Sequence, residues 1–300
     1  MSDITLILLA AGNSSRFDTP VKKQWLRIDH EPLWLYVTNS IKKNLLKCDT
    51  IIVAHPEEYL FIQSMCDEKV IKGGSTRQES LKNALDHVKT PYVLVTDIAR
   101  SCIDSSLIER LLQHKDKADT VVPFLPVHDT VVFENNTIDR DSIKRIQTPQ
   151  LSKTEILKKA LSTSKHFTDE SSAVVAFGGT RYFVEGDSNA TKITLSNDIS
   201  NLGCLLPPSS QTFTGNGFDV HAFEDGKPMV LGGETIDSAF GFKAHSDGDV
   251  ALHALIDALL GAACLGDIGM LFPDNDQQYK NIDSKILLEK CVTILHQFGF

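Results

Sequence analysis

The chain has 300 residues, of which 42% are hydrophobic, and this is more chain than one typical globular domain uses. Its net charge of −9 is uneven: residues 1–210 hold 25 Lys and Arg against 26 Asp and Glu (−1), whereas residues 211–300 hold 5 against 13 (−8). We therefore expect two modules and no nucleic-acid partner, since an acidic chain repels a polyanion. No segment is long and apolar enough to predict a membrane span.

The first predicted element is a buried strand at residues 4–10. A signal-peptide core is the alternative interpretation, but Asp3 precedes the run, no Lys or Arg does, and the run is short. The six cysteines are scattered without a C-x-x-C pair, which predicts free thiols. Together these features indicate a cytoplasmic protein.

Short apolar runs alternate with amphipathic stretches through the first 205 residues. The predicted strands are residues 4–10, 50–54, 92–96, 120–123 and 181–184, and the predicted helices include residues 33–43, 77–87 and 106–117. This alternation is typical of an α/β domain whose mostly parallel sheet has helices on both faces. Ligands of such sheets bind beyond the carboxyl ends of the strands.

Residues 124–147 break the alternation and predict a projecting β-arm that turns near Asn135, of a kind that often serves dimerisation; a surface loop is the alternative. Residues 206–212 have the proline and serine content of a linker. We therefore expect one domain at 1–205 and a second at 213–300.

A loop of small residues, AAGNSSR at 10–16, follows the first strand, and KKQ follows at 22–24. Such a loop lets backbone N–H groups approach a polyphosphate, while the arginine and lysine supply positive charge. The pattern is neither a Walker loop nor a G-x-G-x-x-G turn. It resembles the A-A-G-x-x-x-R signature of nucleotidyltransferases. The alternative is an ordinary turn whose cations are solvated.

Further motifs follow in chain order: GGSTRQES at 73–80, DIAR at 97–100, TPQ at 148–150, TDES at 168–171 and NATKIT at 189–194. With the loop at 10–16, they resemble the 2-C-methyl-D-erythritol 4-phosphate cytidylyltransferase family of the non-mevalonate isoprenoid pathway. The resemblance runs from about residue 4 to residue 202 and implies a Rossmann-like nucleotidyltransferase sheet. It implies transfer of CMP from CTP to methylerythritol phosphate, with release of pyrophosphate and Mg²⁺ bridging the triphosphate.

The resemblance also implies a role for individual residues. CTP would be bound by Ala10, Ala11, Gly12, Ser14, Gly74, Arg77 and Ser80. Arg16, Lys23 and Lys192 would be the catalytic cations, while Asp97, Arg100 and Thr148 would hold the acceptor. Thr130 and Arg140 would reach from the arm into the partner's site of a homodimer. Alternatively, Thr148 and Thr130 are ordinary hydrogen-bonding residues of loops, and Arg140 is a solvated charge of the arm. Ile98 stands where the family has alanine, which makes the acceptor geometry less certain than the reaction class.

The acidic module contains a possible metal site. Asp219 and His221 alternate on a predicted strand, so both side chains would share one face, and His253 lies in a helical pattern. Two imidazoles and one carboxylate leave a fourth tetrahedral position open, as in catalytic zinc sites. Taken singly, each histidine is more simply a core or surface residue.

This module resembles the N-terminal part of 2-C-methyl-D-erythritol 2,4-cyclodiphosphate synthase, and the whole chain resembles natural fusions of the two enzymes. The resemblance implies Zn²⁺ or a similar metal on Asp219, His221 and His253, and cyclisation of the substrate with loss of CMP. His245, Ser246, Asp257, Asp267 and Asp274 would contact the substrate. A complete module would form a trimer. We expect an incomplete α+β module, because the family's later nucleotide-binding region is not found before Phe300.

Two other classes of function stay open at this point. One is a nucleotidyltransferase with another acceptor, such as a sugar 1-phosphate or a molybdopterin. The other is a non-catalytic nucleotide-binding or scaffolding protein, whose second module holds only a structural metal.

Overall fold

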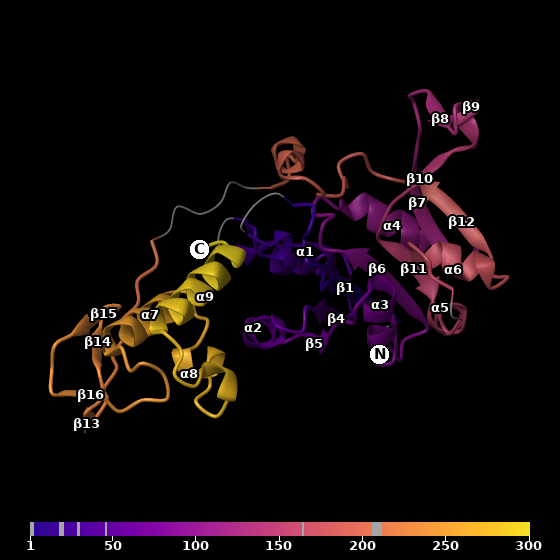
Figure 1. Ribbon diagram of the computed structural model, residues 1–300. Coiled ribbons are helices and arrows are strands. Elements are labelled where there is room, and N and C mark those ends of the chain that lie inside the picture. The colour runs from indigo at the N-terminus through magenta and orange to yellow at the C-terminus, as the bar shows by residue number, and fades with distance from the viewer. Residues whose placement is uncertain (1–2, 18–20, 29–30, 46, 164, 206–211) are drawn as a thin grey trace. The chain divides into compact units, whose positions relative to one another are not determined.

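The computed structural model describes residues 3–17, 21–28, 31–45, 47–163, 165–205 and 212–300 (Figure 1). The Cα positions group into two compact units that divide near residue 208. Most of the linker predicted at 206–212 lies outside the described residues. Within the described ranges, no helix has the length and apolar composition that crossing a membrane requires.

An eight-stranded sheet forms the centre of the first unit in the described residues. Its strands are β1 (Ile4–Ala10), β4 (Asp49–Ala54), β5 (Lys69–Lys72), β6 (Tyr92–Asp97), β7 (Thr120–Pro126), β10 (Lys144–Ile146), β11 (Gln150–Lys153) and β12 (Arg181–Glu185). The order is β10-β7-β11-β6-β1-β4-β5, and β12 pairs with β7. Strands β5, β4, β1 and β6 are parallel neighbours, whereas β11 and β10 run antiparallel to theirs. The predicted mostly parallel α/β sheet is confirmed.

Helices cover both faces because successive residues of a strand point to opposite sides. They are α1 (Leu33–Lys42), α2 (Tyr59–Ser64), α3 (Arg77–Leu85), α4 (Ser105–Gln113), α5 (Thr154–Leu161) and α6 (Glu170–Ala176). Ile7 and Leu9 of β1 belong to one core cluster with Leu81 of α3 and Leu157 of α5. The fully buried Trp34 belongs to α1, which packs on β1.

The segment after β7 forms the predicted arm. Strands β8 (Val131–Phe133) and β9 (Asn136–Ile138) pair antiparallel, and Figure 1 shows this hairpin standing away from the sheet. Glu134 and Asn135 have φ of 48° and 66°, the left-handed backbone that a tight two-residue hairpin turn requires. The arm is thus a hairpin and not an irregular surface loop.

The prediction of free thiols is wrong for two of the six cysteines. Cys102 and Cys204 form a disulfide, with their Cα atoms 5.6 Å apart. Cys102 follows β6, and Cys204 lies just beyond the short helix η3 (Ser196–Asn201), 102 residues later in the chain. The disulfide forms because the chain beyond η3 returns to the segment that follows β6. The spacing of cysteines in the sequence does not reveal such a return. The cytoplasmic location stays a prediction that thiol chemistry no longer supports.

In its described residues, the second unit combines two β-ribbons with three α-helices and is α+β, as predicted. β13 (Phe223–Asp225) pairs with β16 (Phe240–Phe242), and β14 (Met229–Leu231) with β15 (Glu234–Ile236). The helices are α7 (Val250–Ala262), α8 (Ile268–Leu271) and α9 (Ser284–Gln297).

The strand predicted around residues 219–221 is wrong. Residues 212–222 have no regular secondary structure and no strand partner among the described residues. Gly215 and Gly217 in this segment instead lie close against α7, where a Cβ at Gly217 would overlap the carbonyl oxygen of Ala254. Beyond them, the carbonyl of Ala222 accepts from the backbone N–H of Lys243.

Candidate functional site

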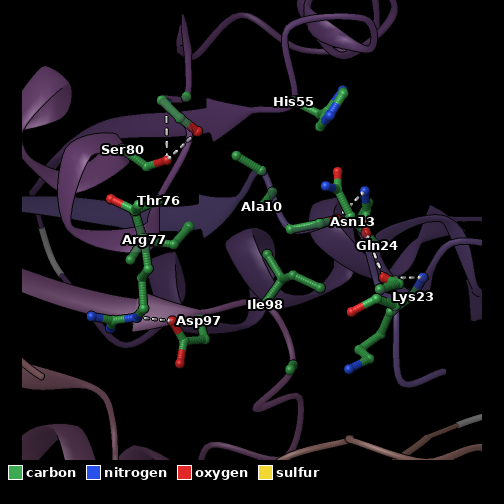
Figure 2. Close-up of a pocket in the computed structure, with 18 of the residues that line it drawn as sticks. Ala10, Asn13, Lys23, Gln24, His55, Thr76, Arg77, Ser80, Asp97 and Ile98 are labelled. Atoms are coloured by element: carbon green, nitrogen blue, oxygen red, sulfur yellow. Dashed lines mark hydrogen bonds and ion pairs between the residues drawn. The ribbon is translucent and has the colours of Figure 1, made fainter. Parts of the chain in front are cut away.

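A cavity of about 550 Å³ opens at the carboxyl ends of β5, β4, β1 and β6 (Figure 2). Eleven of the residues predicted for the first domain lie on its wall: Ala10, Ala11, Gly12, Ser14, Arg16, Lys23, Gly74, Arg77, Ser80, Asp97 and Lys192. Ile98, which stands where the family has alanine, lines the same cavity. The motifs thus meet at the edge where parallel sheets bind ligands.

Two of the loops that line this cavity approach each other closely. A Cβ at Gly73 would lie 2.5 Å from the Cβ of Ala11 and 2.9 Å from the hydroxyl oxygen of Ser80, so only glycine permits this approach. The Ser80 hydroxyl accepts a hydrogen bond from the backbone N–H of Gly74 at 3.0 Å. Ser80 therefore shapes the loop as well as lining the cavity.

Gln24 connects the small-residue loop to the segment that presents Lys23. Its side chain is 1% exposed, and its amide donates to Glu58 at 2.9 Å and to the carbonyl of Gly12 at 3.2 Å. The Ser14 hydroxyl donates to Gln24 at 3.2 Å and accepts from the Lys23 backbone N–H at 3.0 Å. No role was predicted for Gln24 from the sequence, although its place in KKQ, directly after Lys23, was a signal.

Three cations, Arg16, Lys23 and Lys192, line the same cavity. The Lys23 ammonium donates to the carbonyl of Ile193 at 2.7 Å. Burial lowers the pKa of Lys23, and the positive charges of Lys192 and Arg16 lower it further. Such mutual repulsion is relieved when an anion lies between the cations.

Lys192, one of these three cations, is also the first of four residues of alternating charge, each of which pairs with the next. The Lys192 ammonium lies 2.8 Å from Oδ2 of Asp97, whose Oδ1 accepts from Nε of Arg77 at 2.9 Å. Nη1 of Arg77 donates to Glu170 at 2.6 Å. Burial alone would raise the pKa of Asp97, but the charges of Arg77 and Lys192 lower it to about 2. Asp97 is therefore a carboxylate at neutral pH.

The other residues predicted for the first domain lie elsewhere. Arg100 donates to the carbonyl of Ala190 at 2.6 Å, and the buried hydroxyl of Thr148 has no partner among the described residues. Thr130 and Arg140 are exposed on the arm, where Arg140 donates to the carbonyl of His128. None of these four belongs to the described wall of the cavity.

The second unit brings Asp219, His221 and His253 together as predicted. Oδ2 of Asp219 lies 2.9 Å from Nε2 of His221 and 3.0 Å from Nδ1 of His253, and the three donor atoms lie within 4.8 Å of one another. The far nitrogen of His221 lies 3.1 Å from the carbonyl of Lys243, and that of His253 lies 2.9 Å from the hydroxyl of Ser284. Both rings are thus oriented as metal ligands usually are.

The remaining predicted residues of this unit have separate local contacts. Ser246 lies 3.2 Å from His253, whereas the buried Nε2 of His245 has no partner among the described residues. Asp257 accepts from the backbone N–H of Ile268, and Asp267 caps α8. Asp274 is exposed.

The family models that match this chain divide it at nearly the same place as its two compact units. The family model described as 2-C-methyl-D-erythritol 4-phosphate cytidylyltransferase (IspD) matches residues 4–206, and that of the YgbB family matches residues 212–300. The bifunctional enzyme IspD/IspF of Sulfurimonas denitrificans is 56% identical over 297 residues, covering 99% of this chain and 77% of the relative. That of Aliarcobacter butzleri is 51% identical and covers 100% and 80%.

Solved structures of an IspDF enzyme and of a cytidylyltransferase are also similar to this chain. The bifunctional IspDF from Campylobacter jejuni superposes with a TM-score of 0.88 at 46% identity, covering 99% of this chain and 80% of the other. The 2-C-methyl-D-erythritol 4-phosphate cytidylyltransferase from Thermus thermophilus shares the fold of the first unit, with a TM-score of 0.57, 24% identity and coverage of 67% and 97%.

Proposed function

The chain belongs to the bifunctional IspD/IspF family, and from this premise we propose how its own residues divide the two reactions. The first domain is a cytidylyltransferase that uses CTP and 2-C-methyl-D-erythritol 4-phosphate, and the second is a cyclodiphosphate synthase domain. Membership of this family argues against a nucleotidyltransferase with another acceptor, and against a non-catalytic nucleotide-binding or scaffolding protein.

The convergence of Arg16, Lys23 and Lys192 on one cavity is the observation that supports the proposed transfer site. The acceptor's phosphate oxygen attacks the α-phosphorus of CTP, a new P–O bond forms, and the bond to the leaving pyrophosphate breaks. The acceptor phosphate is already anionic, so no general base is required. The cations stabilise the charge that builds on the α-phosphate, and this transfer depends on positioning and electrostatics.

The loop residues Ala10, Ala11, Gly12 and Ser14 would contact the nucleotide with Gly74, Arg77 and Ser80, all of which line the cavity. Asp97 would hold the acceptor together with Arg100 and Thr148, whose buried hydroxyl has hydrogen-bonding capacity to spare. Enzymes of this family depend on metals, and Mg²⁺ would neutralise part of the triphosphate charge when bound.

The donor set of Asp219, His221 and His253 fits a tetrahedral divalent metal with one open position, and zinc suits these nitrogen and oxygen ligands. When bound, the metal would act as a Lewis acid toward a substrate phosphate. Ser246, beside His253, and His245, with its unpartnered nitrogen, would contact the diphosphate. Asp257, Asp267 and Asp274 would contact the rest of the substrate.

The direct test is pyrophosphate release from CTP with and without 2-C-methyl-D-erythritol 4-phosphate in magnesium buffer. We expect release that requires both substrates and that GTP, UTP and dTTP do not support. Release from GTP or UTP at the same rate, or none with this acceptor despite CTP binding, would contradict the proposed substrates.

We further propose that the arm holds a homodimer and delivers Thr130 and Arg140 to the partner's cavity. Val132 and Phe133 are neighbours on the arm and are 60% and 62% exposed, so they form an apolar surface that a partner chain would bury. In the second unit Phe218 and Val220 are 85% and 69% exposed, and apolar side chains that are this exposed favour contact with another chain.

Replacing Phe133 by aspartate should halve the mass of the arm-mediated assembly in light scattering, because a buried charge opposes the apolar contact. Phe177→Asp, at a residue that is 46% exposed on the body of the domain, should leave the mass unchanged. A wild-type chain that is fully active as a 33.1 kDa monomer would exclude both the dimer and the role of Arg140.

A further inference from the structure

Glu170 is a buried carboxylate behind the cavity. It is the first residue of α6, its side chain is 0% exposed, and it is not among the described residues of the cavity wall. Burial raises the pKa of Glu170 and so disfavours its charged form, and a close cation is what opposes this effect. Arg77 supplies it at 2.6 Å, whereas Oε2 of Glu170 has no partner among the described residues. The ion pair with Arg77 is therefore the contact that stabilises the negative charge of Glu170.

Arg77 divides its donors between two carboxylates. Nη1 binds Glu170, and Nε binds Oδ1 of Asp97 at 2.9 Å. A guanidinium with a single carboxylate neighbour commonly binds both of its oxygens through two parallel hydrogen bonds. Glu170 draws Arg77 away from that arrangement.

The second oxygen of Asp97 is consequently left for another donor. Lys192 occupies it at 2.8 Å, and Asp97 and Lys192 both line the cavity. Along the series Glu170, Arg77, Asp97 and Lys192 the charges alternate and sum to zero. Removing the charge of Glu170, at the buried end of this series, therefore alters the charge balance around Asp97 and Lys192, which line the cavity.

We propose that Glu170 is a positioning residue of the cytidylyl transfer, which holds Arg77 to one oxygen of Asp97 and keeps the other oxygen for Lys192 and the acceptor. This inference rests on the proposed function of Asp97 and Lys192. Glu170 touches no substrate and acts through Arg77. Its loss would let Arg77 take both oxygens of Asp97 and displace Lys192.

Glu170→Gln tests this inference because it keeps the shape and removes the charge. We expect kcat/KM for the methylerythritol phosphate to fall about 10- to 100-fold, the range found when outer partners of site residues are removed. The Kd for CTP, measured by calorimetry, should rise as well, because Arg77, which changes position, is proposed to contact the nucleotide. Glu155→Gln, at an exposed carboxylate of α5, should have wild-type kinetics. Glu170→Asp, which keeps the charge but is one methylene shorter, should lose less activity than Glu170→Gln.

A double-mutant cycle with Arg77→Lys separates positioning from plain stabilisation of the fold. Lysine lacks the planar fork through which Nε and Nη1 of Arg77 hold Asp97 and Glu170, so Glu170→Gln should have little further effect in that background. Additive losses, or a Glu170→Gln enzyme with lower Tm but wild-type kcat and KM, would overturn the inference. If Glu170→Gln does not fold, wild-type kinetics in Glu170→Asp would overturn it as well. Absence of pyrophosphate release by the wild-type chain would instead contradict the proposed function.

Discussion

Replacing Lys23 by alanine should reduce pyrophosphate release from CTP about 100- to 1,000-fold, the loss typical when one preorganised donor to a developing anion is removed. The side chain reaches the cavity that Arg16 and Lys192 also line, and its ammonium is held by the carbonyl of Ile193. The backbone N–H of Lys23, which Ser14 binds, is kept in the variant. The loss should therefore appear in the rate and not in the fold.

The measurement is the initial rate of pyrophosphate release at saturating CTP and acceptor, beside thermal unfolding. Lys159→Ala, at an exposed lysine of α5, is the matched control and should keep the wild-type rate. A Lys23→Ala enzyme within a few-fold of the wild-type rate would remove Lys23 from the catalytic group.

The pH dependence of this activity should also reflect Lys23. A lysine is charged below its pKa, and burial together with Lys192 and Arg16 lowers the pKa of Lys23. The free enzyme therefore loses this charge at a lower pH than an ordinary lysine does, and kcat/KM should fall on the alkaline side accordingly. In Lys23→Arg this alkaline fall should move to higher pH, because arginine stays protonated. An unchanged profile would mean that another group titrates.

Replacing His253 by alanine should abolish high-affinity binding of a divalent metal by the second domain. Asp219 and His221 would keep only two of the three donor atoms that lie within 4.8 Å of one another. Zinc binding of the whole chain after equilibrium dialysis should fall from about one ion per chain to near zero, since protein sites for zinc usually supply three or four ligands. Zinc should also stabilise the wild type against unfolding, by about 2.7 kcal/mol at a concentration 100 times its Kd, and should not stabilise the variant.

His253 also contacts Ser284 and Ser246, so its removal could disturb packing. His221→Ala, at a ring whose side chain is 22% exposed, should lose the metal without that disturbance. His296→Ala, at an exposed histidine of α9, should bind zinc like the wild type. Equal zinc binding by the wild type and both ligand variants would contradict the metal site.

The amino-acid sequence by itself determined the class of the first domain and the location of its site. Apolar runs such as β1, and turn chemistry such as the loop at residues 10–16, depend on near neighbours in the chain, so both can be predicted locally. The short strand β11 was missed because its sequence, QLSK, contains no apolar run. The residue types of the metal site were likewise evident, but the strand expected for Asp219 and His221 was wrong.

Only the tertiary structure decided which distant residues meet. Glu170 reaches Arg77 across 93 residues, and Cys102 reaches Cys204 across 102. It also placed Gln24 between Gly12 and Glu58, and left Thr130 and Arg140 exposed on the arm. These contacts depend on how separate loops return to one edge of the sheet. Neither helical nor strand periodicity records that return, because both patterns describe only which face of its own element a residue occupies.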